Sequence, residues 1–138
     1  MSAIVVDASA VGAALLPDEA GVVGGLVLKL SGEADFIAPP HWPIELMSLI
    51  LRASRRGRIT AAERDEARGS AAQIIEFADI DSSIAAVQAL DLAVRYNMSI
   101  YDAAYLALAR SRRLPLLTKD RNLLRIALQE EIELVWRP

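Results

Sequence analysis

Short apolar runs rich in β-branched residues alternate along this chain with longer stretches of helical character. The first run, Ala3–Val6, ends at Asp7, and the second, Asp35–Ala38, is closed by Pro39 and Pro40. Further strands are predicted at residues 77–80, 114–118 and 133–136. Apolar strands separated by helices are typical of a parallel sheet covered on both faces. The pattern therefore predicts one α/β domain over residues 1–138, with a central parallel sheet of about five short strands between helices.

The intervening stretches carry helix start and stop signals. Residues 8–16 are apolar and Ala-rich and are stopped by Pro17, and residues 41–58 have Pro43 in the first turn, where proline is tolerated. Thr60 and Glu63 form a capping box that opens a helix predicted to reach about residue 76. Further helices are predicted at residues 19–30, 83–96, 103–112 and 121–130. The first of these is weakened by its glycines.

The composition indicates which residues build the core and in which cellular compartment the protein is expected. Hydrophobic residues make up 54% of the 138 residues and aromatic residues only 5%, which argues against disorder and predicts an aliphatic core. The chain has no cysteine, so disulfides and thiolate sites are excluded, and a cytoplasmic location is expected. The first apolar run is too short for a signal peptide, and longer apolar stretches are interrupted by charges, glycine or proline. We therefore expect no membrane segment.

The net charge of −3 argues against a protein that coats nucleic acid by bulk electrostatics. It does not exclude a nuclease, because a cation held on carboxylates can bind phosphate instead. Two arginine clusters stand out, at residues 52–58 and 110–113. The guanidinium group suits phosphate, but the simpler interpretation is that both clusters lie at helix C-termini, where the helix dipole favours cations.

Two acidic residues lie just after the carboxyl ends of predicted strands. Asp7 comes immediately after the first strand, and Asp120 follows the strand at residues 114–118 by two positions. In open parallel sheets, ligands bind at the carboxyl ends of the strands. Each residue is also a favourable N-cap for the helix that follows it. The sequence leaves both interpretations open.

Two further acidic residues lie in strongly apolar surroundings. Glu45 is in the first turn of a predicted helix, where an acid favours the helix dipole, but almost all its neighbours are apolar. A buried, unpaired carboxylate is costly, so Glu45 should have a cation or a hydrogen-bond partner. Asp102 begins a helix that is apolar on every side and is therefore predicted to be buried. Either Ser99 or Asp102 could cap that helix.

Carboxylates that are brought together repel one another, and the pKa of each rises unless a cation is present. Magnesium suits such a cluster because it prefers oxygen ligands. Two such cations about 3.5–4 Å apart could activate a water and stabilise the leaving oxygen of a phosphodiester. Zinc is not expected because there is no cluster of histidine or cysteine. The single histidine, His41, is predicted to be a surface residue before its helix.

Four segments resemble the PIN-domain nucleases, and among them the VapC-type toxins of toxin–antitoxin pairs. They are VDASA at residues 6–10, PIEL at 43–46, YDAAYLALA at 101–109 and LLTKD at 116–120. The third segment is the most specific one. The four segments in this order and spacing are more specific than any one of them.

The resemblance implies a three-layer domain with a five-stranded parallel sheet, and a hydrolase that cleaves RNA endonucleolytically with Mg²⁺ or Mn²⁺. It also implies a toxin that forms a homodimer and is neutralised by an antitoxin protein covering the active site. The residues that would hold the metal and its water are Asp7, Glu45, Asp102 and Asp120. The hydroxyls of Ser9 and Thr118 would orient carboxylates or water.

Two other functions are compatible with parts of the pattern. A phosphatase of the haloacid-dehalogenase type would use Asp7 as a covalent nucleophile, but it needs an acid two residues later, where Ser9 stands. A non-catalytic receiver-like or scaffold domain would use the acids only as helix caps, with slight support from Lys119 after a strand. Met47 and Leu51 could contribute to a dimer interface, although core packing explains them equally well.

Overall fold

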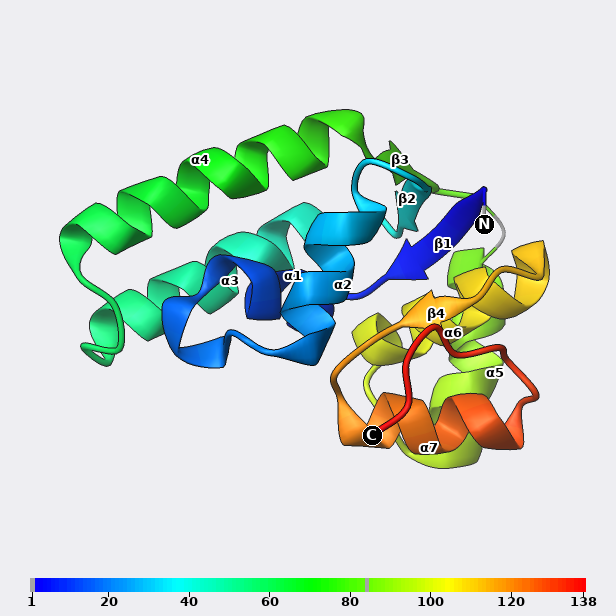
Figure 1. The fold of residues 1–138 in the computed structure, drawn as a ribbon. Helices are drawn as coiled ribbons and strands as arrows, with labels where there is room; N and C mark the ends of the chain where they lie inside the picture. The colour runs from blue at the N-terminus through cyan, green and yellow to red at the C-terminus, as the bar shows by residue number, and fades with distance from the viewer. Residues whose placement is uncertain (1, 84) are drawn as a thin grey trace.

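The computed structural model describes residues 2–83 and 85–138, and its centre is a parallel sheet (Figure 1). The strands are β1 (Ala3–Val6), β2 (Asp35–Ala38), β3 (Asp79–Ile80) and β4 (Leu116–Leu117), in the spatial order β3-β2-β1-β4. All pairs are parallel, as predicted. The chain moves from β1 outward to β3 and then crosses back to β4, so the order reverses between β1 and β4. Ligand sites of open α/β sheets lie at such a reversal.

Residues 133–136 do not form the predicted fifth strand. Only Leu134 pairs with the sheet, through a single parallel bridge to Leu116. Two backbone hydrogen bonds frame this bridge, from the Leu116 N–H to the Glu133 carbonyl and from the Val135 N–H to the Leu116 carbonyl. Because β4 is itself only two residues long, it offers too short an edge for a longer neighbouring strand.

The helices form a layer on each face of the sheet (Figure 1). On one side are α1 (Ala8–Leu15), α2 (Val22–Leu30), α3 (Trp42–Arg55) and α4 (Ala61–Phe77), and on the other are α5 (Ala85–Tyr96), α6 (Ile100–Arg112) and α7 (Arg121–Gln129). This division follows from right-handed crossovers, because the chain crosses the sheet in one direction up to β3 and in the opposite direction afterwards. The predicted three-layer α/β architecture is confirmed.

Two helix starts show how local sequence sets the boundaries. The helix predicted from residue 19 begins only at Val22, because Pro17–Glu19 forms a 3-10 turn and Gly21 is extended. The predicted capping box at the start of α4 is confirmed: the Glu63 N–H donates to the Thr60 hydroxyl at 3.1 Å, and the Thr60 N–H donates to the Glu63 carboxylate at 2.9 Å.

The main core is aliphatic and is centred on β1, whose residues Ile4, Val5 and Val6 are fully buried. A second, smaller core joins α3 and α4 where this pair of helices extends away from the sheet (Figure 1). Arg52 and Arg55 lie in the last turn of α3, which supports the simpler interpretation of that arginine cluster. Among the described residues, no helix is both long enough and apolar enough to cross a membrane.

The packing of α1 against α2 leads to a stability prediction at Gly24. A Cβ atom there would lie 2.5 Å from the backbone carbonyl oxygen of Ala13, so Gly24→Ala has to push the two helices apart. We expect a loss of about 1–3 kcal/mol in the free energy of unfolding, measured with urea. The adjacent Gly25 has open space around its Cβ position, and Gly25→Ala should stabilise α2 by about 0.5–1 kcal/mol. Equal stabilities of the two variants would contradict this packing.

Candidate active site

Asp7 is a buried carboxylate at the carboxyl end of β1. It caps α1, with Oδ1 accepting a hydrogen bond from the Ala10 N–H at 3.1 Å, so the N-cap interpretation of this residue is correct. The Ser9 hydroxyl lies 2.8 and 2.9 Å from the two carboxylate oxygens. Only 4% of Asp7 is exposed, whereas capping alone does not require burial. Burial therefore raises the pKa of Asp7 from 3.8 to about 7, against the lowering effect of these hydrogen bonds.

Ser9 and Thr118 link the carboxyl ends of the neighbouring strands β1 and β4. The Ser9 hydroxyl accepts a hydrogen bond from the Lys119 N–H at 3.0 Å and lies 3.4 Å from the Thr118 hydroxyl. Thr118 is 1% exposed, and its hydroxyl accepts a hydrogen bond from the Asp120 N–H at 3.0 Å. Both hydroxyls lower the pKa of Asp7. They therefore lie where they can orient its carboxylate.

Asp120 caps α7 and faces the same edge of the sheet. Its Oδ1 accepts hydrogen bonds from the N–H groups of Asn122 and Leu123, at 2.8 and 3.0 Å. Its negative charge raises the pKa of both Asp7 and Asp102, which places Asp120 within electrostatic reach of both carboxylates. The N-cap interpretation is again correct for Asp120, but it does not account for this clustering.

Asp102 is free of the capping role that the sequence left open. Ser99 caps α6 instead, with its hydroxyl accepting a hydrogen bond from the Asp102 N–H at 3.1 Å. The Asp102 carboxyl is half-buried, and its pKa is raised by burial first and then by the charges of Asp120 and Glu45. The side chain of Asp102 is thus held near two other carboxylates without a structural role of its own at the helix start.

Glu45 has the hydrogen-bond partner that its apolar surroundings require. The hydroxyl of Tyr105, which is 1% exposed, donates to Glu45 Oε1 at 3.0 Å. Burial and the charge of Glu45 both raise the pKa of Tyr105 above its usual range, so its hydroxyl stays protonated. Tyr105 follows Asp102 by three positions on α6 and so projects from the same side of the helix. That spacing was the available sequence signal for a residue that the sequence analysis missed.

His41 is not the surface residue that the sequence predicts. Its ring lies edge-on to two tyrosines, with centroids 5.3 Å from Tyr101 and 5.2 Å from Tyr105. Its Nε2 atom lies 2.9 Å from Glu45 Oε1, although the N–H is not aligned for a hydrogen bond. The prediction fails because His41 begins the turn into α3 beside the start of α6, where the two aromatic rings cover it.

The four acidic residues thus form a chain of interacting charges that we call the carboxylate cluster. Its members are Asp7, Glu45, Asp102 and Asp120. The charge of Asp120 raises the pKa of Asp7, and the charges of Asp120 and Glu45 raise the pKa of Asp102. Within residues 2–83 and 85–138, no three acidic or histidine side chains converge tightly enough to enclose a metal ion. The cluster is therefore open and has oxygen donors only, which fits a hard cation that retains several waters.

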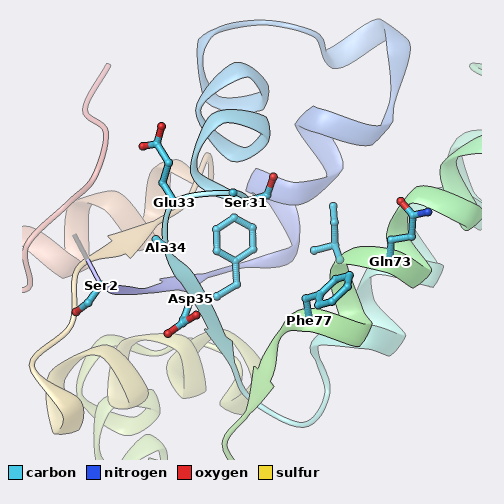
Figure 2. Close-up of a pocket in the computed structure, with 10 residues that line it drawn as sticks. Ser2, Ser31, Glu33, Ala34, Asp35, Gln73 and Phe77 are labelled. Carbon is cyan, nitrogen blue, oxygen red and sulfur yellow. The ribbon is translucent and has the colours of Figure 1, made fainter.

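A larger cavity lies elsewhere on the molecule. It has a volume of about 560 Å³ and opens at the amino edge of the sheet, between Ser2, Asp35 and Phe77 (Figure 2). None of the carboxylate cluster lines it. The carboxylates with raised pKa values, Asp7 and Asp102, lie at the opposite, carboxyl edge, which makes that edge the candidate site rather than this cavity.

Comparison with known proteins gives one family and two similar solved structures. The family model described as PIN domain matches residues 4–128. The fold is similar to that of PAE2754 from Pyrobaculum aerophilum, with a TM-score of 0.68 and 20% identity over 90% of this chain and 84% of that one. It is also similar to VapC20 of Mycobacterium tuberculosis, a Sarcin-Ricin loop cleaving toxin, with a TM-score of 0.65 and 20% identity over 98% and 99% of the two chains. None of the curated protein sequences matches this chain.

The burial of Asp7 predicts a pH-dependent stability for the metal-free protein. Because the pKa of Asp7 is about 7 when folded and 3.8 ordinarily, the unfolded chain loses this proton first as the pH rises. Stability should therefore fall between about pH 4 and pH 7, and Asp7→Asn should remove much of this fall. Above that window the variant should be more stable than the original protein by up to about 4 kcal/mol, measured by urea unfolding in EDTA.

Asp35→Asn is the matched control, because Asp35 is an exposed carboxylate at the opposite edge of the sheet. It removes one negative charge but should leave the pH dependence unchanged. A strong loss of stability in Asp7→Asn at neutral pH would show that the charge of Asp7 has a structural role instead.

Proposed function

Because the chain belongs to the PIN domain family, we propose that it is an endoribonuclease that hydrolyses RNA with Mg²⁺ or Mn²⁺, and that residues 1–138 act as one nuclease domain. PIN nucleases generally use a divalent metal. The observation that carries the proposal is the carboxylate cluster itself. It lies at the strand reversal between β1 and β4, and it includes a carboxylate, Asp7, that is almost completely buried.

Helix capping alone does not explain this cluster. Asp7 and Asp120 are caps, but Asp102 is not, since Ser99 caps its helix. Glu45 lies in the first turn of α3, but its carboxylate accepts a hydrogen bond from the Tyr105 hydroxyl rather than capping the helix. A scaffold domain would gain nothing from bringing four like charges together at one edge of the sheet. This distribution of roles favours a cation site over a non-catalytic domain.

The residues present fit a divalent cation. We assign Asp7, Glu45, Asp102 and Asp120 as its ligands, directly or through water, since the set contains only oxygen donors. When bound, the cation would offset the mutual repulsion of the carboxylates, lower the pKa of a water and neutralise charge on the phosphodiester. An open cluster is adequate for this purpose, because Mg²⁺ is usually bound by one or two carboxylates together with water and substrate oxygens.

The surrounding side chains would set the positions of these ligands. The Ser9 hydroxyl donates a hydrogen bond to the Asp7 carboxylate. The Thr118 hydroxyl lies beside Ser9 and accepts a hydrogen bond from the Asp120 N–H. The two hydroxyls would therefore orient the acidic residues that follow β1 and β4. Tyr105 and His41 both contact Oε1 of Glu45, which leaves Oε2 as the oxygen for a ligand. Groups of this kind restrict the orientation of a metal ligand and commonly change metal affinity or activity by about 10–100-fold when removed.

We further propose that the protein acts as the toxin of a toxin–antitoxin pair. The similarity of its fold to VapC20, over nearly the full length of both chains, supports this biological role. The expected partners are an RNA substrate, an antitoxin protein that covers the carboxylate cluster and a second copy of the chain, in the cytoplasm. For the dimer, Leu51 remains an available contact because it is 44% exposed, whereas Met47 is partly buried against the core.

The phosphatase alternative has no specific support in the site. Ser9 occupies the position where such an enzyme needs a general acid, and its hydroxyl lies within hydrogen-bond distance of both oxygens of Asp7. This contact favours Asp7 as a held ligand rather than as a free nucleophile.

The test is RNA cleavage by EDTA-treated protein with and without added Mg²⁺ or Mn²⁺. We expect cleavage only with metal, and a loss of at least about a hundredfold in rate for Asp102→Asn, since a charge at the reacting centre is removed. Asp35→Asn should cleave at the rate of the original protein. Cleavage in EDTA, or full activity in Asp102→Asn, would overturn the assignment of the site.

A further inference from the structure

A second cavity adjoins the carboxylate cluster along the carboxyl edge of the sheet. It has a volume of about 250 Å³ and lies between the turn after β2, the segment after β3 and the first turns of α5 and α6. His41 and Tyr101 form part of its wall. His41 contacts Glu45 and acts electrostatically on Asp102, so this residue links the wall of the cavity to two members of the cluster.

The lining of this cavity is mostly apolar where the structure describes it. Its apolar residues are Pro39, Pro40, Ala86, Ala89, Ile100 and Ala104. Asp81 is the acidic residue in the lining, and its carboxylate already accepts hydrogen bonds from the Ser83 N–H at 2.8 Å and from Arg112 at 3.3 Å. The Nε2 atom of His41 faces Glu45 Oε1 at 2.9 Å rather than the open part of the cavity. Among the described residues of the lining there is no lysine or arginine for a phosphate, whereas a neutral group would bury apolar surface.

The size of the cavity suits one planar ring system. Its volume is below the roughly 300–1,000 Å³ of pockets for drug-sized ligands. Tyr101 is 60% exposed, and because its contact with His41 is edge-on, at most one face of its ring is used. Unpaired bases of RNA stack on such aromatic faces. The hydroxyls of Ser82 and Ser83 add polar groups for the edge of a base.

We propose that this cavity holds one unpaired nucleobase of the RNA substrate, stacked on Tyr101, beside the phosphodiester at the carboxylate cluster. The inference rests on the proposed ribonuclease function and adds a substrate requirement to it. A base in a duplex is stacked and paired on its neighbours, so it cannot enter the cavity without leaving the helix. The enzyme should therefore prefer single strands and loops.

The test compares steady-state cleavage of a single-stranded RNA by the original protein and by Tyr101 variants, with Mn²⁺ present. Loss of a stacking partner should raise KM about five- to a hundredfold in Tyr101→Ala, with little change in kcat. Tyr101→Leu keeps an apolar side chain without a flat face and should behave like the alanine variant, whereas Tyr101→Phe should keep the original KM. Phe77→Ala is the matched control, because Phe77 is 83% exposed at the opposite edge.

Abasic substitution of the same RNA, one nucleotide at a time, provides the decisive comparison. One abasic position should raise KM for the original protein and have no further effect in Tyr101→Ala. Normal KM in Tyr101→Ala, or full rescue by Tyr101→Leu, would overturn the stacking proposal while leaving the ribonuclease intact. Absence of any metal-dependent RNA cleavage by the original protein would overturn the proposed function and this inference together.

Discussion

The desolvation of Asp7 is the constraint on which the rest of the site depends. In β1, which pairs with β2 and β4, the last three residues are fully buried, and Asp7 is the next residue along the chain. Its carboxylate cannot move to solvent, because it caps α1 and is held by Ser9. A buried carboxylate without a cation is destabilising when ionised. The fold therefore builds an unfavourable charge into its central strand, and a bound cation would relieve that cost.

The other members of the carboxylate cluster increase this effect rather than relieve it. Asp120 raises the pKa of Asp7 and of Asp102, and Glu45 raises that of Asp102 further. The neighbouring hydroxyls of Ser9 and Thr118 only partly compensate. Natural proteins accept such local conflicts mainly at functional sites. The same edge of the sheet also carries the neutral cavity beside Tyr101, so a charged region and an uncharged one lie next to each other where an RNA strand would have to bind both phosphate and base.

Much of this arrangement could be predicted from the sequence because it depends on local patterns. The strand ending at Asp7 and the capping box at Thr60 involve residues close together in the chain. The failures concern tertiary contacts. The strand predicted at residues 133–136 has only a two-residue partner, and the exposure of His41 is decided by tyrosines some 60 positions later, on α6. Sequence patterns likewise could not determine that Ser99, rather than Asp102, caps α6.

The central claim is that the carboxylate cluster is a cation site organised around Asp7. Its most direct test is a titration with Mn²⁺, in which the free ion is measured by electron paramagnetic resonance for the original protein, Asp7→Asn and Asp35→Asn. The account predicts that the original protein and Asp35→Asn bind Mn²⁺ equally, and that Asp7→Asn binds it at least about tenfold more weakly. Equal affinity in all three proteins, or no binding by any of them, would contradict it.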